Sequence, residues 1–301
     1  MTPLQRYIAE EIATDHVDGL LSRREAFRRL ALLGVGAASA AALIAACGRD
    51  RPADTGTVAS SPTDAGPPPG AADPLPTAPI TWAGPRGELQ GAWAEAPNAR
   101  GGVLVIHENK GLNDWTRSVA GRLAGVGYSA LAIDLLSGDG GTARFADPAE
   151  ATAALGKIPP EDALADLESG IAELQRRVPE RKVAAVGFCM GGGFVWRLLD
   201  AGVPQLAAAV PFYGPTPEKP DFSGSKDVAV LAFYGERDQR VNATKPAARA
   251  ALGQAGLVYE IVTEPGADHA FFNDTNPDRY DAAAAEDAWR RMLEWFERHV
   301  D

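Results

Sequence analysis

The chain has 301 residues, of which 46% are hydrophobic, and a formal net charge of −11 at pH 7. An acidic chain without a basic stripe argues against nucleic acid as a partner. Two cysteines are too few for a disulfide framework.

The N-terminal 46 residues have the features of an export signal. A basic stretch, Ser22–Leu30, precedes an uncharged run from Ala31 to Ala46. This run is shorter than the roughly 20 apolar residues that span a bilayer, but it suits the apolar region of a signal peptide. Arg23-Arg24 followed by Phe27 resembles a twin-arginine (Tat) signal. The alternative is a buried Ala-rich helix that ends at a free cysteine. The role of residues 1–22 stays open.

Cys47 marks the expected end of this signal. Ile44-Ala45-Ala46-Cys47 resembles a lipobox, in which the cysteine is lipidated and becomes the first residue. Residues 47–79 are rich in Pro, Gly and Ala and have too few large apolar side chains to fold, so they are expected to form a disordered tether. We therefore expect an exported protein, a periplasmic or cell-envelope lipoprotein, with a lipid anchor in the membrane and a folded domain over residues 80–301.

Strands and helices alternate along this domain. The apolar patterns predict strands at 80–83, 89–93, 103–106, 130–133, 182–186, 206–212, 228–233 and 258–262, and helices at 115–123, 161–178, 194–199, 245–255 and about 279–300. This order is typical of an α/β fold in which a mostly parallel central sheet has helices on both faces. In such sheets the active site forms at the carboxyl ends of the strands.

A nucleophile elbow is the most specific motif in the chain. Gly187-Phe188-Cys189-Met190-Gly191-Gly192-Gly193 follows the strand at 182–186 and precedes the helix at 194–199. A strand, a sharp Gly-flanked turn and a helix, with a nucleophile at the apex, define the elbow of α/β-hydrolases. The residues two before and two after the nucleophile must be small, and both are glycine here. Cys189 is therefore the candidate nucleophile, although a lone cysteine in an apolar stretch is more often a small core residue.

An acid and a histidine follow Cys189 in the order that this fold demands. Asp238 follows one strand and His269 follows the next, so nucleophile, acid and histidine come in the α/β-hydrolase order. His269 would accept the thiol proton and later deliver it to the leaving group. Asp238 would fix the imidazole tautomer, although Glu236 or Asp268 could take its place. Of the other histidines in the domain, His107 is expected to be structural and His299 to lie on the surface.

Four segments together resemble the dienelactone hydrolase family. They are His-Glu-x-x-Gly-Leu at 107–112, Gly-Phe-Cys-Met-Gly-Gly-Gly at 187–193, Tyr-Gly-x-x-Asp at 234–238 and Asp-His-Ala-Phe at 268–271. The resemblance implies that Glu108 contacts the catalytic thiol and helps to deprotonate it when substrate arrives. The other interpretation of Glu108 is an ion pair with Lys110 or a nearby arginine. The oxyanion hole would consist of the backbone N–H groups of Met190 and Asn109.

Two departures from the family pattern bear on the substrate. Family members that hydrolyse the anionic dienelactone hold its carboxylate with arginines, expected here near 135–138 and a few residues after His269. The first segment has no arginine, Arg144 being the nearest, and the second has Asn273. Because arginine is hard to replace in bidentate carboxylate binding, the anionic dienelactone is an unfavourable substrate. The sequence has no metal-ligand spacing and no GxGxxG fingerprint, so no cofactor or metal is expected.

These observations predict a hydrolase that cleaves a small-molecule ester or lactone through a thioacyl enzyme on a Cys189–His269–Asp238 triad. A thiol acyl hydrolase of another specificity, such as a peptidase or thioesterase, is the alternative within enzymes. A surface lipoprotein that binds without turnover is the alternative from another class.

Overall fold

A computed structural model describes residues 1–49 and 67–301. One eight-stranded sheet, in the order β1-β2-β4-β3-β5-β6-β7-β8, forms its centre. The strands are β1 (Ala78–Gly84), β2 (Gly87–Ala94), β3 (Gly101–Ile106), β4 (Tyr128–Asp134), β5 (Val183–Phe188), β6 (Leu206–Phe212), β7 (Ala229–Gly235) and β8 (Tyr259–Glu264). The pairs β1–β2 and β2–β4 are antiparallel, and all other pairs are parallel. The predicted α/β-hydrolase architecture is therefore confirmed.

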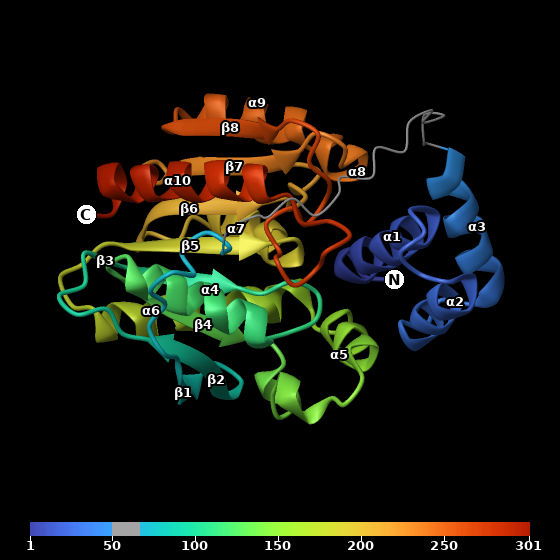
Figure 1. The fold of residues 1–301 in the computed structure, drawn as a ribbon, viewed down its shortest axis with the longest axis horizontal. Coiled ribbons are helices and arrows are strands. Elements are labelled where there is room, and N and C mark those ends of the chain that lie inside the picture. The colour runs from blue at the N-terminus through green and yellow to red at the C-terminus, as the bar shows by residue number, and fades with distance from the viewer. Residues whose placement is uncertain (50–66) are drawn as a thin grey trace.

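Helices cover both faces of the sheet. In Figure 1, α4 (Asp114–Gly125) and α10 (Ala282–His299) lie in front of it, and α6 (Pro160–Arg177) and α7 (Met190–Ala201) lie behind. The remaining helices are α1 (Pro3–Val17), α2 (Arg23–Leu32), α3 (Ala37–Arg49), α5 (Pro148–Leu155), α8 (Gln239–Asn242) and α9 (Lys245–Ala255), with short 3₁₀ turns at Ser137–Asp139 and Thr142–Arg144. The last helix begins at Ala282 rather than near 279, because the Asp281 side chain caps it by accepting from two backbone N–H groups.

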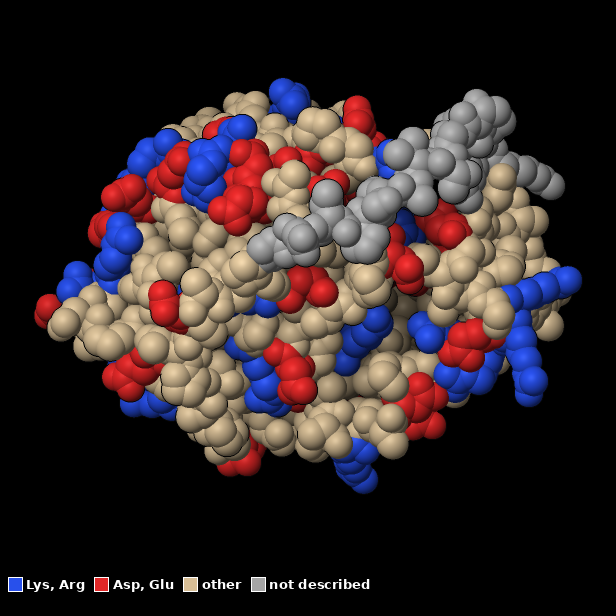
Figure 2. Space-filling model, viewed as in Figure 1, with Lys and Arg blue, Asp and Glu red and all other residues tan. Residues whose placement is uncertain are grey.

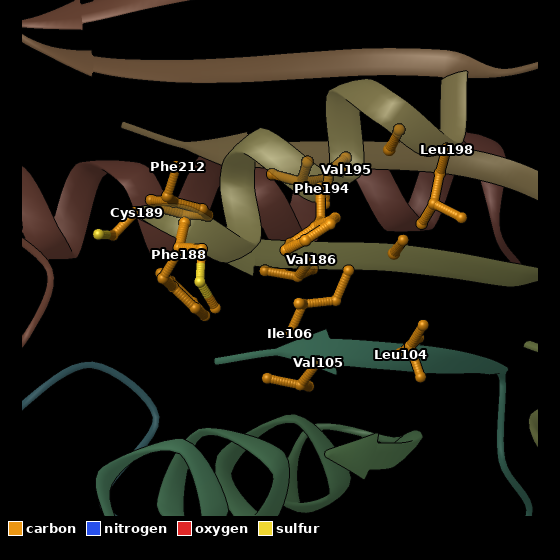
Figure 3. Close-up of a cluster of buried hydrophobic side chains, with 14 of the residues drawn as sticks. Leu104, Val105, Ile106, Val186, Phe188, Cys189, Phe194, Val195, Leu198 and Phe212 are labelled. Carbon is orange, nitrogen blue, oxygen red and sulfur yellow. The ribbon is translucent and has the colours of Figure 1, made fainter. Parts of the chain in front are cut away.

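The central strands are apolar throughout because helices cover both of their faces. Every residue of β3 and of β5 is buried, and Val105 pairs with Val186 in parallel register. Figure 3 shows the side chains of these strands packed against those of α7, with Cys189 at the edge of the cluster. The core therefore fixes the end of β5, where the elbow begins.

Charged side chains of both signs mix over the surface. On the face seen in Figure 2, Lys and Arg are interspersed with Asp and Glu. On α10, for example, Arg290 pairs with Asp287 at 2.5 Å and with Glu294 at 2.6 Å. Exposed pairs of this kind contribute little to stability, but they leave no continuous basic stripe on that face.

The first 49 residues form three helices beside the sheet. In Figure 1, α1, α2 and α3 lie together beyond the ends toward which the central strands point. Thr2 and Gln5 form a capping box at the start of α1. The uncharged run predicted as a signal is divided between α2 and α3 by a turn, in which Gly34 has φ 81°. Within the described residues, no helix is long and apolar enough to cross a membrane. Export and lipidation of Cys47, which lies in α3, stay predictions.

Part of the predicted tether is ordered. Residues 50–66 of that segment lie outside the described residues, but residues 67–77 run along α4. The Leu75 N–H donates to the Gly121 carbonyl at 2.9 Å, and a Cβ at Gly125 would lie 2.1 Å from the Asp73 carbonyl oxygen. The prediction of disorder over 47–79 is therefore wrong for this part. Gly121 and Gly125, about one turn apart on α4, let the backbone of this segment approach the helix closely.

Candidate active site

The turn after β5 has the strained geometry of a nucleophile elbow. Cys189 has φ 56° and ψ −116°, a backbone conformation that residues other than glycine rarely adopt. Its N–H donates to the Phe212 carbonyl at 3.0 Å, which ties the turn to β6. A Cβ at Gly187 would lie 2.2 Å from the Gly191 carbonyl oxygen, and one at Gly191 would lie 2.3 Å from the Ile106 carbonyl oxygen. Both flanking glycines are therefore required by the close backbone approach, as the sequence predicted.

The Cys189 side chain lies where the apolar core ends. In Figure 3 its sulfur points away from the cluster formed by Phe188, Phe212 and the β3 side chains. Only 2% of the residue is exposed. The nucleophile candidate is therefore positioned by the core but sealed from solvent.

His269 and Asp238 form a close pair. Asp238 ends the turn after β7, and its Oδ1 accepts from the Val241 N–H at 3.1 Å, which caps α8. Its Oδ2 lies 2.5 Å from Nδ1 of His269. The other ring nitrogen, Nε2, is buried and has no hydrogen-bond partner among the described residues. His269 is therefore oriented by Asp238 and keeps Nε2 available for proton transfer.

Each member of this pair stabilises the charge of the other. Burial raises the pKa of Asp238, but the imidazolium of His269 and the Arg240 guanidinium outweigh burial, so the pKa lies below its usual value. Burial lowers the pKa of His269, and the Asp238 carboxylate outweighs it, so this pKa is raised. The arrangement favours the imidazolium that proton transfer from a thiol would create.

The two acids that could have replaced Asp238 have other partners. Glu236 accepts from the Gly266 N–H at 2.7 Å, and Asp268 lies 3.6 Å from Arg279. His107 is structural: its Nδ1 donates to the Glu108 carbonyl at 2.6 Å and its Nε2 accepts from the Leu135 N–H at 3.2 Å. His299 lies at the end of α10.

The Cys189 thiol makes its contacts with α1, which sequence analysis left without a role. Both carboxylate oxygens of Glu11 lie 3.3 Å from Sγ, and the Tyr7 hydroxyl is also at 3.3 Å. Burial first, and then the Glu11 and Glu108 carboxylates, raise the pKa of the thiol well above its usual value. A signal was present in the sequence: Leu4, Tyr7, Ile8 and Ile12 recur with helical spacing.

Glu108 lies beside the thiol but is held by other partners. Its Oε2 accepts from the Asn273 side chain at 2.8 Å and its Oε1 from the Tyr213 hydroxyl at 3.4 Å. Burial raises the pKa of Glu108 above its usual value. Within the described residues, Glu108 forms no hydrogen bond with Cys189 and no ion pair with Lys110, so the contact with the thiol that the family resemblance implies stays a prediction. Asn273, which stands where the family pattern places an arginine, thus orients Glu108.

The two residues predicted to form the oxyanion hole lie near the thiol. Met190 is the first residue of α7, where backbone N–H groups have no partner within the helix and the helix dipole favours negative charge. Asn109 follows β3, and its side-chain amide donates to Oε1 of Glu11 at 2.8 Å. Both residues therefore lie at the site, and Asn109 additionally binds α1 through its side chain.

One cluster in the described part of the chain has the spacing of a metal site. Ligand atoms of Glu11, Cys189 and His269 all lie within 4.8 Å of one another. A thiolate, an imidazole and a carboxylate suit Zn²⁺. Here, however, the Cys189 thiol donates to Glu11, so a protonated, hydrogen-bonded cluster accounts for the arrangement.

Comparison with known proteins places this site in a family. The sequence profile of the dienelactone hydrolase family matches residues 89–300. The chain belongs to the dienelactone hydrolase family. An Escherichia coli K12 relative, provisionally named carboxymethylenebutenolidase, is 35% identical over 209 residues, which are 65% of this chain and 76% of the relative. A Salmonella typhimurium relative with the same provisional name is 34% identical over 230 residues, which are 71% and 84%.

Solved structures agree with this membership. A crystal structure from Klebsiella pneumoniae, provisionally titled a dienelactone hydrolase, has a TM-score of 0.64 and 32% identity and covers 74% of this chain and 99% of its own. A dienelactone hydrolase-like promiscuous phosphotriesterase from metagenomic libraries has a TM-score of 0.58 and 26% identity, over 75% of this chain and 100% of its own. The dienelactone hydrolase fold thus accounts for about three quarters of this chain, and the protein is a hydrolase of that family.

Proposed function

We propose that this hydrolase cleaves a small ester or lactone through a thioacyl intermediate on Cys189, with His269 and Asp238 completing the triad. The observation that carries the proposal is the strained elbow cysteine next to a histidine that is oriented by a buried aspartate at 2.5 Å. The alternative roles for these residues, a core cysteine or a loop histidine, explain neither the positive φ of Cys189 nor the free Nε2 of His269.

The reaction would proceed in two halves. His269 Nε2 takes the proton from the Cys189 thiol, and the thiolate attacks the carbonyl carbon. The resulting oxyanion is stabilised by the backbone N–H groups of Met190 and Asn109. The C–O bond then breaks as His269 protonates the leaving oxygen. In the second half, His269 deprotonates a water that attacks the thioester, and the acid leaves as Cys189 regains its proton.

A neutral ester or lactone suits this site better than the anionic dienelactone. Asn273 donates its side-chain amide to Glu108, so the position that would carry an arginine instead orients an acid. Arg144 is exposed, and its Nη1 donates to the Asp139 carbonyl at 3.0 Å. Neither position supplies a bidentate clamp for a substrate carboxylate.

Substitution of the nucleophile tests the proposal. Cys189→Ala is expected to abolish turnover of p-nitrophenyl esters and lactones without loss of the fold. Cys189→Ser should retain a small residual rate, because the elbow and oxyanion hole persist while the hydroxyl is harder to deprotonate. His269→Ala should lose about as much as Cys189→Ala, since triad members act as a unit. An alanine variant at position 189 with wild-type turnover would refute the assignment.

For the N-terminus, we propose export with cleavage before Cys47 and lipidation of that cysteine. Support comes from the basic stretch, the uncharged run and the lipobox-like Ile44–Cys47. Two acyl chains would anchor a soluble domain stably, at roughly 0.8 kcal/mol per buried CH₂. Mass spectrometry of the full chain, expressed in a bacterium that processes lipoproteins, decides the matter. An unmodified N-terminus at Met1 or Thr2 in the cytosolic fraction would refute both cleavage and lipidation.

A further inference from the structure

Helix α1 occupies the space that a substrate must enter. A reacting carbonyl carbon has to come within about 3–3.5 Å of the nucleophile. Both Glu11 carboxylate oxygens already lie at 3.3 Å from Sγ of Cys189, and the Tyr7 hydroxyl lies at the same distance. Asn109, a predicted oxyanion-hole residue, donates its side-chain amide to Glu11. The Glu11 carboxylate therefore stands where the acyl group of a substrate would bind.

The hollow beside α1 does not include the sulfur of Cys189 in its lining. A hollow of about 340 Å³ lies between the start of α1 and the start of α7, and Tyr7, Met190 and Phe194 are among the residues that line it. Cys189 is not among them, and only 2% of it is exposed. Substrate can reach the thiol only if α1 moves.

Ion pairs hold α1 against the loop that carries His269. Arg279 lies 3.3 Å from Asp15 and 2.7 Å from Asp18, both near the end of α1. The Arg240 guanidinium lies 4.6 Å from the centre of the Tyr7 ring, a cation–π distance. The acidic helix therefore docks on two arginines, and its ion pairs with Arg279 involve side chains other than those that contact the thiol.

Apolar contacts complete the docking. Ile8 and Ile12 of α1 are buried and belong to the same core cluster as the strands of the sheet. Helix α2 pairs with the start of α5 through Arg28 and Asp147, at 2.8 Å. The N-terminal helices are thus packed on the domain by both apolar and charged side chains.

We propose that α1 is an intramolecular inhibitor of the hydrolase, and that activity requires its release from the active site. In the closed state the thiol donates to Glu11 while His269 Nε2 has no hydrogen-bond partner among the described residues. On release, Glu11 no longer accepts from the thiol, and the S–H proton can pass to His269. The Glu11 carboxylate is also one cause of the raised thiol pKa, so its departure favours the thiolate. Cleavage before Cys47, as proposed above, would remove α1 altogether.

Thiol alkylation in the full chain tests this inhibition directly. In a Cys47→Ser background, Cys189 is the only cysteine, and its second-order rate with iodoacetamide can be followed by mass spectrometry. Asp15→Asn with Asp18→Asn removes the ion pairs with Arg279. We expect alkylation about tenfold faster, corresponding to about 1.4 kcal/mol of docking free energy, and a similar rise in kcat/KM for p-nitrophenyl acetate.

A matched control removes two acids that do not contact α1. Glu168 and Asp227 are both exposed, and Glu168→Gln with Asp227→Asn makes the same change in net charge. This control should alkylate at the unsubstituted rate. Alkylation of the Asp15/Asp18 variant at the control rate would overturn the proposal. Circular dichroism and thermal unfolding of both variants show whether the fold is retained.

Glu11→Ala provides a second, independent arm. It should raise the alkylation rate and kcat/KM together, because it clears the acyl position. A lower kcat/KM with an unchanged alkylation rate would instead mean that Glu11 serves catalysis, and would overturn the inhibitory role. The activity measurements rest on the proposed thioacyl mechanism, whereas alkylation does not. Faster alkylation without any ester turnover would therefore leave the inhibition standing and refute only the mechanism.

Discussion

Asp238→Asn should separate the catalytic role of this carboxylate from its structural role. Oδ1 of Asp238 caps α8 through the Val241 N–H, and Oδ2 accepts from His269. Asparagine is as good an N-cap as aspartate, so Oδ1 is expected to keep its bond to Val241. The amide NH₂ group then faces Nδ1 of His269. Two donors cannot pair, so the imidazole must place its proton on Nε2.

The magnitude follows from these contacts. Loss of a hydrogen bond to a charged group costs about 1.5–3 kcal/mol, which corresponds to roughly 10- to 150-fold in rate. A proton on Nε2 additionally prevents His269 from accepting the thiol proton. Together these effects should lower kcat/KM about 10³- to 10⁴-fold. The free energy of unfolding should fall by less than about 2 kcal/mol, because the cap persists.

The assay compares kcat/KM for p-nitrophenyl acetate in the full chain with and without Asp238→Asn. Both proteins carry the same α1, so occlusion by that helix affects both sides of the ratio. Asp227→Asn, which removes an exposed acid, is the matched control and should be neutral. A rate within fivefold of wild type for Asp238→Asn would refute the triad role. Urea unfolding at pH 7 checks the stability part, and collapse of the fold would refute the argument that the cap is preserved.

Three further predictions concern other parts of the structure. Gly187→Ala should destabilise the fold by about 3 kcal/mol or more, because its Cβ would lie 2.2 Å from a backbone oxygen. The control is Gly138→Ala, whose Cβ would meet nothing within 4 Å and which should be neutral. Equal urea-unfolding midpoints for the two variants would contradict the reasoning. Glu108→Gln should lower ester turnover and change the pH profile of Cys189 alkylation, and identical profiles would show that Glu108 does not act on the thiol. Burial raises the pKa of Glu264 from 4.5 to about 7, so between these pH values the folded state holds a proton that the unfolded state releases. The free energy of unfolding should therefore fall by about 1–3 kcal/mol as pH rises from about 4.5 to about 7. Glu264→Gln should abolish that part of the pH dependence in thermal unfolding, and an unchanged slope would contradict the assignment.

The sequence alone was enough for the sheet and the elbow. Short apolar runs rich in β-branched residues, such as Val103–Ile106, are typical of strands buried on both faces. Glycines at 187 and 191 are needed because the turn brings backbones this close. Cys189, Asp238 and His269 each follow a strand of the parallel sheet, so their side chains meet at the same edge. The strands and the elbow are local features, so a short stretch of sequence determines each of them.

Only the tertiary structure decided what touches the thiol. Glu11 and Cys189 are far apart in the chain, and nothing in the local pattern of α1 states which surface it covers. The same holds for Glu108, whose partners Asn273 and Tyr213 come from other segments. Side-chain contacts between distant segments depend on the sum of all packing in the fold. Composition misjudged residues 67–77 for the same reason, because it does not record the backbone hydrogen bond from Leu75 to Gly121 or the bond from the Arg122 side chain to the Pro69 carbonyl, which tie that segment to α4.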